Sequence, residues 1–419
     1  MTTRPPATEL VTLEDVEAAR KVLAGFVRVT PLEPSRPLTA ALGGPAWLKC
    51  ENVQRAGSYK IRGAYLRISR LTDAERERGV VAASAGNHAQ GVALAASLLG
   101  TRSTVFMPVG APLPKVAATK SYGATVEFAG NTVDDSITAA EQFAERTGAI
   151  LIHPFDHRDV IAGQGTVALE ILEQCPDVRT IVTGIGGGGL ISGISSVAKP
   201  AGVRVIGVQA EGAAAVPTSL KAGRPVRLES YTTIADGIAV GRPGDLCFAH
   251  IAAQVDDVVT VSEEDIARAM IMLIERSKLV VEPAGAVGVA ALLAGVVKVE
   301  TPVVILLTGG NIDPLLMMRV VERGLAAAGR YLRFTVRCPD RPGQLAALLT
   351  LIGAEGANIN DVMHERHDPR LRLGEVEVEL SVETKGSEHS DRLIQSLRRG
   401  GYEVAFVRGG GPPRRRRGA

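Results

Sequence analysis

One lysine of this sequence stands where its neighbours could give it reactive chemistry. Lys60 follows Gly57, Ser58 and Tyr59 in a short turn, after the apolar strand-like segment 47–50 and at the start of a helix. A lysine whose surroundings lower its pKa presents a neutral amine, which can form a Schiff base with a carbonyl compound. Most lysines are solvated surface charges, so Lys60 becomes a candidate only if other segments could share a site with it.

A second segment could bind an anion beside that lysine. The residues Ser84-Ala85-Gly86-Asn87-His88 follow the strand-like run 80–83 and open a helix. Small residues at such a turn expose backbone N–H groups at the positive end of the helix dipole, which suits a carboxylate. The alternative is a purely structural helix cap made by Ser84 or Asn87.

A third segment is built almost entirely of glycine. The loop Gly186-Gly187-Gly188-Gly189-Leu190 follows the apolar strand-like run 180–183 and precedes a helix. Glycines let the backbone close around a phosphate group, which then faces the N-terminus of the helix. A flexible linker is the alternative, but a linker does not stand between a buried strand and a helix.

The same loop also satisfies a dinucleotide-binding pattern. Gly184, Gly186 and Gly189 fit G-x-G-x-x-G, and Glu211 follows about twenty residues later. An NAD-dependent oxidoreductase is therefore the principal alternative. We disfavour an oxidoreductase for two reasons. The glycine loop lies mid-chain with no second nucleotide-binding half after it, and a dinucleotide site would not explain the Lys60 and Ser84 turns.

In this order and spacing, the three segments resemble the fold-type II pyridoxal-phosphate enzymes, and within them the threonine dehydratases with one short C-terminal regulatory domain. Segments 233–240, 281–286 and 307–311 match the same family. The resemblance implies pyridoxal phosphate as cofactor and β-elimination of L-threonine to 2-oxobutanoate and ammonia, and of L-serine to pyruvate.

The resemblance also implies roles for individual residues. Lys60 would hold the cofactor and, once released, take the Cα proton, while Tyr59 packs near the cofactor ring. Thr308 would face the pyridine nitrogen, and Glu282 would either lie near the active site or only stabilise a helix dipole. The other implied contacts are Asn87 with the ring oxygen, Gly186, Gly187, Gly188, Gly189 and Leu190 with the phosphate, and Ser84, Ala85, Gly86 and His88 with the substrate carboxylate.

Two other activities stay open beside elimination. Racemases of this family have a serine acid/base where this chain has Ala85, which has no proton to give, so we expect elimination to dominate. A non-catalytic amino-acid sensor is formally possible, although the intact Lys60 and glycine loop argue against it. The sequence does not separate threonine from serine as preferred substrate, since one methyl group in a pocket is worth only about 1–3 kcal/mol.

Length and composition indicate a multi-domain globular protein. The 419 residues are 46% hydrophobic and 22% charged, and they exceed what one hydrophobic core supports. The net charge of +2 includes four arginines at 414–417, so nucleic acid is not an expected partner. The four cysteines form no C-x-x-C pair, and no signal-like or membrane-length apolar run occurs, so we expect a cytoplasmic protein.

Strand-like and helix-like segments alternate through residues 1–328. This pattern predicts an α/β catalytic region in two parts, with parallel sheets covered by helices on both faces and a smaller subdomain inserted at about 62–160. The carboxyl ends of parallel strands lie on one rim, so Ser84, Gly184 and Thr308 should meet there. The expected strands are 80–84, 103–108, 125–129, 150–153, 180–184, 203–210, 258–261 and 303–308.

The pattern changes near residues 327–330. Residues 331–408 follow the βαββαβ order of a ferredoxin-like domain, and 409–419 are expected to form a disordered arginine-rich tail. Segments 340–345 and 357–359 resemble those of an ACT domain, which implies an amino-acid effector such as isoleucine or valine, bound between paired copies in a homodimer or homotetramer. A stabilising appendage is the alternative. The implied effector contacts are Gly343, Gln344, Leu345, Asn358 and Ile359.

No metal site is predicted. The pairs His153/His157 and His364/His367 have suggestive spacings, but Pro154 breaks the first as a helix and the second lies in a strand-like stretch. Some relatives hold a divalent cation near the position of Glu211 with a second acid a few residues on. Here Ala215 and Pro217 stand in that stretch, so the site is incomplete.

Overall fold

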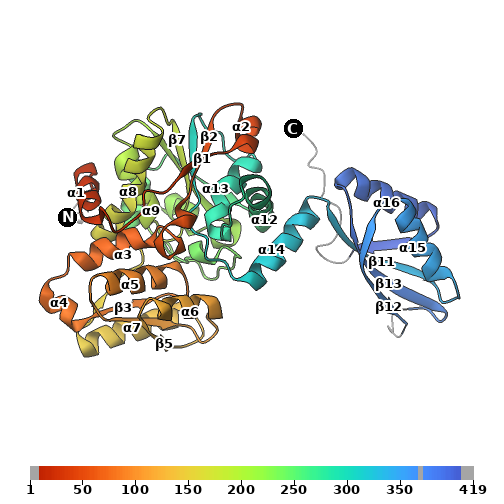
Figure 1. Cartoon of the computed structure of the whole chain (residues 1–419), viewed down its shortest axis with the longest axis horizontal. Coiled ribbons are helices and arrows are strands. Elements are labelled where there is room, and N and C mark those ends of the chain that lie inside the picture. The colour runs from red at the N-terminus through yellow and green to blue at the C-terminus, as the bar shows by residue number, and fades with distance from the viewer. Residues whose placement is uncertain (1–8, 367–370, 407–419) are drawn as a thin grey trace. The chain divides into compact units, whose positions relative to one another are not determined.

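The computed structural model describes residues 9–366 and 371–406. The chain folds into two compact units, Met1–Pro314 and Leu315–Ala419 (Figure 1). Helix α14 (Pro314–Ala327) groups almost wholly with the second unit, although the sequence pattern changes only after it. The arginine-rich tail at 409–419 and His367 lie outside the described residues.

The larger sheet of the first unit has six strands in the order β1-β2-β10-β7-β8-β9. All neighbouring strands are parallel except β1, which runs antiparallel to β2 at one edge. The predicted α/β class is confirmed, and the short edge strand is a departure from the expected all-parallel pattern. The strands are β1 (Leu32–Pro34), β2 (Ala46–Lys49), β7 (Thr180–Gly184), β8 (Arg204–Ala210), β9 (Asp257–Val261) and β10 (Val303–Leu306).

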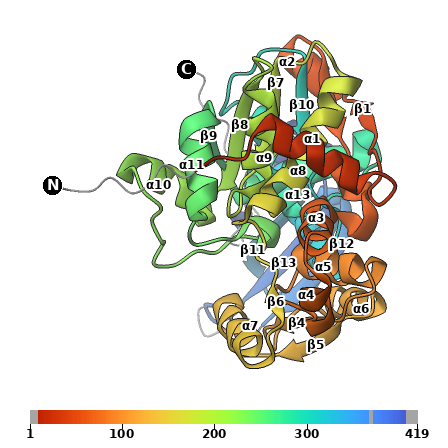
Figure 2. The same cartoon turned by 90° about the vertical axis from the view of Figure 1, so that its left-hand side faces the viewer.

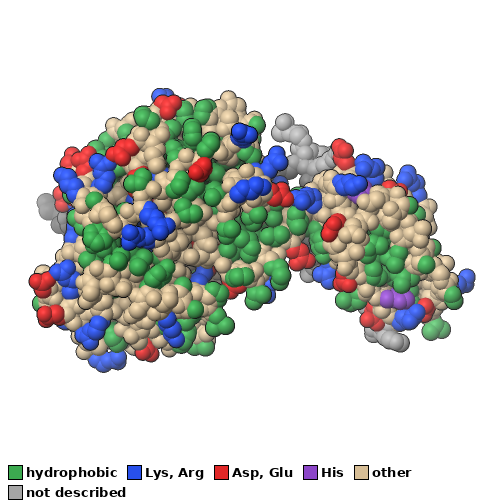
Figure 3. Space-filling view, viewed as in Figure 1, with side chains coloured by type: hydrophobic (Ala, Val, Ile, Leu, Met, Phe, Trp, Pro, Cys, Tyr) green, Lys and Arg blue, Asp and Glu red, His purple; other side chains and the backbone are tan. Residues whose placement is uncertain are grey.

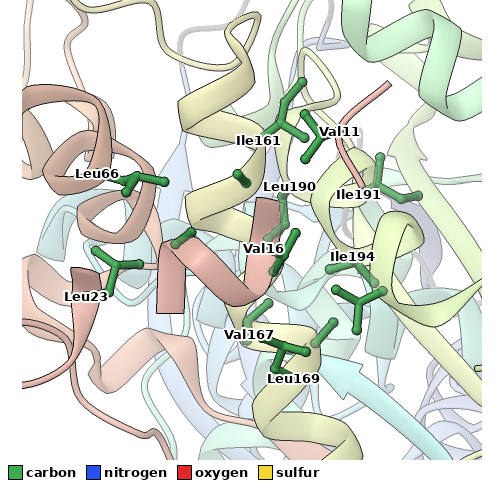
Figure 4. Packing of buried hydrophobic residues seen from close by; sticks show 14 of the residues in the cluster. Val11, Val16, Leu23, Leu66, Ile161, Val167, Leu169, Leu190, Ile191 and Ile194 are labelled. Atoms are coloured by element: carbon green, nitrogen blue, oxygen red, sulfur yellow. The ribbon is translucent and has the colours of Figure 1, made fainter. Parts of the chain in front are cut away.

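Helices cover both faces of this sheet because its central strands are apolar on both sides. Ile181 of β7 belongs to a buried cluster with α8 (Arg158–Gln174) and α9 (Gly189–Ala198), whose packing against α1 (Leu13–Leu23) is shown in Figure 4. The next residue, Val182, faces α13 (Pro283–Leu293) on the other side. The sheet is therefore buried in the middle of the unit, and only its ends can form an open site.

The smaller sheet is parallel, in the order β5-β4-β3-β6. One buried cluster joins it to α5 (Asn87–Leu98) and α6 (Leu113–Ser121), and another joins its opposite face to α7 (Val133–Thr147). Figure 2 shows these helices on the two sides of the strands. The strands are β3 (Val80–Ala83), β4 (Ser103–Met107), β5 (Thr125–Phe128) and β6 (Ile150–Leu151), close to the predicted runs.

The second unit contains the predicted βαββαβ domain. Its antiparallel sheet has the order β12-β13-β11-β14, and buried residues of α15 and α16 share one apolar cluster with the strands. This order places the first and third strands at the centre, as the ferredoxin-like topology requires. The elements are β11 (Tyr331–Pro339), α15 (Gln344–Ala354), β12 (Asn358–Glu365), β13 (Glu375–Glu383), α16 (Ser387–Arg399) and β14 (Glu403–Phe406).

The surface of the first unit carries charges of both signs. On the face in Figure 3, lysine and arginine side chains are interspersed with aspartate and glutamate, as the small net charge leads one to expect. Among the described residues, no helix is long and apolar enough to cross a membrane. The remaining elements are α2 (Arg36–Leu42), η1 (Glu51–Val53), η2 (Arg55–Gly57), α3 (Lys60–Ser69), α4 (Asp73–Arg78), η3 (Glu211–Ala213), α10 (Ala215–Ala222), η4 (Asp236–Ile238), α11 (Asp245–Gln254), α12 (Glu263–Met272) and η5 (Leu273–Ser277).

Candidate active site

The turns that follow three strands come together at one place. Strand β3 leads into the Ser84 turn, β7 into the glycine loop and β10 into the loop at Thr308. The lysine turn joins them through a β-bridge between Ser58 and Gly309 and a hydrogen bond of 3.3 Å from the Tyr59 N–H to the Thr308 carbonyl. The carboxyl ends of strands from both sheets thus surround one space, as predicted.

This space is a cavity of about 480 Å³, large enough for a cofactor and a small substrate. Glu282 and Thr308 do not line it directly, but both are buried in the neighbouring wall. The predicted residues that line the cavity are Tyr59, Lys60, Ser84, Ala85, Gly86, Asn87, His88, Gly186, Gly187, Gly188, Gly189 and Leu190.

Lys60 is the first residue of α3, and its amine lies inside the cavity wall. The Nζ atom donates a hydrogen bond of 3.0 Å to the Pro154 carbonyl and lies 5.2 Å from the centre of the Tyr59 ring. Burial lowers the pKa of Lys60 to about 8, and the nearby Cys247 and Glu282 only partly oppose this shift. A neutral amine is therefore available near neutral pH, which a Schiff-base lysine requires.

The glycine loop has no room for side chains. A Cβ atom on Gly187 would overlap the ring of Phe155, and one on Gly188 would come within 2.7 Å of Cys247. Gly188 has a φ of 109°, which side-chain-bearing residues rarely adopt, and it precedes α9, whose N-terminus has no side-chain cap. The free N–H groups of this turn and the helix dipole fit a phosphate group.

The Ser84 turn presents a second uncapped helix. Helix α5 begins after Gly86, and neither Ser84 nor Asn87 caps it; the Ser84 hydroxyl instead accepts a bond of 3.1 Å from the Gly86 N–H. The alternative of a purely structural cap is therefore not what the structure contains. His88 makes a 2.7 Å hydrogen bond to the Ile152 carbonyl, and burial together with the charge of Lys60 lowers its pKa to about 3. This side chain is neutral and fixed.

Asn87 is held by two partners from other parts of the chain. Its amide donates 2.6 Å to Glu282 Oε1 and accepts 2.9 Å from Asn311 Nδ2. A side-chain amide has two N–H donors, so Asn87 keeps one for a ligand. Glu282 Oε2 and Ser58 Oγ are buried without a hydrogen-bond partner, which is unusual because most buried polar atoms in folded proteins have one. Neither residue lines the cavity, but each lies next to a residue that does, Glu282 through its bond to Asn87 and Ser58 as the neighbour of Tyr59.

Thr308 lies just behind this cluster. Its hydroxyl is buried and makes only a long contact of 3.5 Å with the Ala284 carbonyl. The hydroxyl therefore has only a weak partner in the protein, but it does not line the cavity, so its role toward a ring nitrogen stays a prediction. Glu282 directly precedes α13, and it also bonds to Asn87 in the cavity wall. Its position therefore agrees with both predictions, that it lies near the active site and that it stands at the start of a helix.

Three residues of the site were not singled out from the sequence. Phe155 covers the glycine loop, and Lys115 and Asp236 form an ion pair in the cavity wall. Asp236 stands in segment 233–240, which matched the family, but no role followed from that match. No local pattern of α6 separates Lys115 from Lys120 of the same helix, so the sequence offered no signal for it.

The position of Glu211 does not support the alternative of a dinucleotide-binding site. This residue begins η3, is exposed and does not line the cavity next to the glycine loop. Among the described residues, no group of three or more His, Cys, Asp or Glu side chains could hold a metal ion.

The candidate effector residues lie at the two ends of the C-terminal sheet. Gly343 precedes α15 after the end of β11, with Gln344 and Leu345 in the first turn of that helix. Asn358 pairs with Glu383, and Glu383 pairs with the first residue of β11, so Asn358 and Ile359 lie at the other end. At about 3.4 Å per residue, the two groups are separated by nearly the length of a nine-residue strand. They do not meet within one copy of the domain.

Comparison with protein families matches residues 23–309 to the family described as pyridoxal-phosphate dependent enzyme, and residues 332–399 to the ACT domain. The chain belongs to the pyridoxal-phosphate dependent enzymes and carries an ACT domain. The predicted family, cofactor and C-terminal domain are confirmed.

The curated relatives point to one kind of lyase. The L-threonine ammonia-lyase of Thermotoga maritima is 46% identical over 400 residues, covering 95% of this chain and 100% of that protein. The L-threonine ammonia-lyase of Geobacter sulfurreducens is 48% identical over 399 residues, covering 94% and 98%. The catabolic L-threonine dehydratase TdcB of Escherichia coli K12 is 45% identical over 310 residues, which are 72% of this chain and 94% of TdcB. The predicted resemblance to threonine dehydratases is confirmed by these matches.

Solved structures similar to this chain include a threonine deaminase and also a serine racemase. The threonine deaminase of tomato, Solanum lycopersicum (isoform 2, processed form), is 34% identical with a TM-score of 0.70, covering 76% of this chain and 96% of that one. Maize serine racemase is 37% identical with a TM-score of 0.71, covering 76% and 98%. The fold of the first unit is thus shared by dehydratases and racemases.

Proposed function

We propose that this enzyme removes water from L-threonine to give 2-oxobutanoate and ammonia, and acts on L-serine in the same way to give pyruvate. The observation that carries the proposal is one cavity lined by the half-buried Lys60, by a glycine loop with no room for side chains, and by the uncapped N-terminus of α5. The two relatives of nearly full length, both named L-threonine ammonia-lyase, support threonine as substrate.

In the proposed β-elimination, the cofactor and Lys60 have different roles. Pyridoxal phosphate, when bound, withdraws electrons from the substrate Cα. Lys60 would hold the cofactor, and once its amine is free, Nζ would take the Cα proton of the substrate; its pKa of about 8 suits it to this base role. The β-hydroxyl group leaves with a proton as water, and the resulting enamine reacts with water to release the oxo acid and ammonia.

Other residues hold the two reactants in place. The N–H groups of Gly186, Gly187, Gly188, Gly189 and Leu190 bind the phosphate, and those of the Ser84 turn bind the substrate carboxylate. Glu282 and Asn311 fix the orientation of the Asn87 amide, and its remaining N–H would be available to the oxygen on the cofactor ring. Thr308 offers the ring nitrogen a hydroxyl, which does not keep that nitrogen protonated as a carboxylate would.

Racemisation needs a second acid/base group on the other face of the substrate. Ala85 lines the cavity where the family's racemases have a serine, and its methyl group cannot deliver a proton. We therefore propose that elimination dominates, despite the structural likeness to maize serine racemase.

A product assay tests the proposed reaction. Purified enzyme with pyridoxal phosphate and L-threonine should form 2-oxobutanoate and ammonia in equal amounts, with D-allo-threonine, the Cα epimer of the substrate, at only a small fraction of that rate. Formation of D-allo-threonine without oxo acid would instead identify a racemase.

We further propose that the ACT domain binds an amino-acid effector between paired copies, so that the enzyme is a homodimer or homotetramer. The support is geometric: the Gly343 turn and Asn358 lie at opposite ends of one sheet, and a second copy can bring them together. Isoleucine and valine are the effectors to try. Removal of residues 331–419 should abolish any effect of these amino acids while turnover persists; an effect that survives the deletion would place the effector site elsewhere.

We also propose that the enzyme works in the cytoplasm. All four cysteines are buried and unpaired, which fits a reducing compartment.

A further inference from the structure

A second lysine stands in the wall of the cavity and has no part in the reaction described above. Lys115 lies in the first turns of α6, and only 7% of its side chain is exposed. Its ammonium group forms an ion pair with Asp236 of η4. Both residues line the cavity. A lysine this buried needs a partner, and the pair provides one inside the site itself.

The position of Lys115 relates it to the substrate rather than to the phosphate. A Cβ atom on Gly86 would lie 3.9 Å from Lys115 Nζ, so the ammonium group faces the Ser84 turn. That turn, with the uncapped start of α5, is the proposed place for the substrate carboxylate. The phosphate-binding loop instead packs against Phe155 and Cys247. The ammonium group of Lys115 therefore lies beside the Ser84 turn, which is the proposed site of the substrate carboxylate.

The number of donors allows Lys115 to serve two partners at once. An ammonium group has three N–H donors, and one is directed to Asp236 Oδ2. The side chain of Asp236 is 47% exposed, so this carboxylate retains contact with solvent while it orients the lysine. A substrate carboxylate arriving at the Ser84 turn can accept a second N–H without breaking the pair.

We propose that Lys115 binds the α-carboxylate of the substrate directly and so selects amino acids with a free carboxylate, while Asp236 positions it. The inference deepens the proposed function, because it assumes that the substrate carboxylate lies at the Ser84 turn. A charge-assisted hydrogen bond of this kind is strong, so its loss should weaken the binding of a carboxylate ligand about 10- to 100-fold.

The competing explanation is that the pair only ties two segments together. Lys115 and Asp236 are 121 residues apart and join α6 to η4. A second pair between Asp134 of α7 and Arg227, at 3.3 Å, makes a similar connection nearby. If the Lys115–Asp236 pair were only such a tie, breaking it from either side would have the same consequence for every ligand.

The test compares two ligands that differ only at the carboxyl group. L-Alanine and L-alaninamide are titrated into the holoenzyme, and each dissociation constant is read from the change in the visible spectrum of the cofactor. Neither ligand has a β-hydroxyl group to lose, so binding is measured without turnover. The ratio of the two constants is compared between the wild type, Lys115→Met, Lys115→Arg and Asp236→Asn, with Lys115→Gln as a second neutral variant should Lys115→Met fail to fold.

The neutral variants should weaken L-alanine binding about 10- to 100-fold and L-alaninamide binding less than about threefold. Lys115→Arg should recover part of the lost alanine affinity, and Asp236→Asn should change the ratio much less than Lys115→Met, because the cation remains and loses only the partner that positions it. Equal losses for both ligands in the neutral variants, or a ratio that Asp236→Asn changes as much as Lys115→Met, would overturn the proposal. Absence of threonine turnover in the wild type would refute the proposed reaction and leave this binding result unaffected.

Discussion

The side-chain amide of Asn87 donates a hydrogen bond of 2.6 Å to Glu282 Oε1. Asn87 begins α5, which packs on the smaller sheet, and Glu282 precedes α13, which packs on the larger one. Burial raises the pKa of Glu282 to about 7, the charge of Asp236 adds to the rise, and Lys115 and Asn87 oppose it. This bond therefore links the two parts of the catalytic region through a carboxyl group that titrates near neutral pH.

Glu282 should make the stability of the apoprotein depend on pH. Its carboxyl group has a pKa of about 7 when folded and about 4.5 when unfolded, so the folded state binds the proton more tightly. The stabilisation is complete below the unfolded pKa and is lost as the pH rises through about 7, on the order of 3 kcal/mol in all. Glu282→Gln cannot titrate, so its urea midpoint relative to wild type should rise between pH 5 and pH 8.

The exposed Glu17 of α1 offers a matched control for that experiment. Glu17→Gln should show no comparable change in relative stability over the same range. A Glu282→Gln variant whose midpoint stays at a constant offset from wild type would show that Glu282 does not titrate in this window.

Lys60 should set the pH dependence of cofactor capture. Only the neutral amine attacks the aldehyde, and burial lowers the pKa of Lys60 to about 8. The rate at which apoprotein takes up pyridoxal phosphate covalently should rise about tenfold from pH 6 to pH 7 and level off above about pH 9. Stopped-flow absorbance measures this rate, with Lys60→Ala as the control that forms no covalent link. A rate that keeps rising tenfold per unit to pH 10 would mean an ordinary, solvated lysine.

The glycine loop should tolerate no added methyl group. In Gly187→Ala the new Cβ atom would overlap the ring of Phe155, so the loop must move and the phosphate contacts change. The dissociation constant for pyridoxal phosphate, measured by equilibrium dialysis, should rise at least about tenfold, since charge-assisted hydrogen bonds are lost. Gly110→Ala is the control, because nothing lies within 4 Å of a Cβ there. Equal affinities in the two variants would remove the loop from the phosphate site.

The turnover number for threonine should depend on the charge at position 308 and not on the methyl group of Thr308. Thr308→Ser keeps the hydroxyl beside the Ala284 carbonyl and should retain kcat within about threefold. Thr308→Asp would hold the ring nitrogen protonated and bury a carboxylate, so kcat for threonine should fall more than about tenfold. Steady-state kinetics at saturating threonine measures both. Unchanged turnover in Thr308→Asp would place the ring nitrogen away from this residue.

The parts of the site that are contiguous in the sequence could be predicted. Lys60, the Ser84 turn and the glycine loop each stand at the junction of a strand and a helix, and apolar runs marked those strands. Parallel topology then places the turns on one rim. The C-terminal domain was equally accessible, because strict alternation in 375–380 identifies a half-buried strand.

The contacts that join distant segments could not be predicted. The Asn87–Glu282 bond spans 195 residues and the Lys115–Asp236 pair spans 121, so no local pattern reveals either. Phe155 covers Gly187 because of how α8 packs on the sheet, which depends on the whole core. The antiparallel strand β1 (Leu32–Pro34) was not predicted, because a three-residue strand carries too little alternation to be seen in the sequence.

The visible spectrum of the purified protein, before and after addition of L-threonine, tests the central claim most directly. A protein whose Lys60 holds pyridoxal phosphate is yellow, and its absorption band should shift when threonine displaces the lysine, then return as the substrate is consumed. Lys60→Ala should show neither the linked band nor its return. A wild-type protein that stays colourless with added pyridoxal phosphate, or whose band does not respond to threonine, would contradict the assignment of cofactor, lysine and substrate.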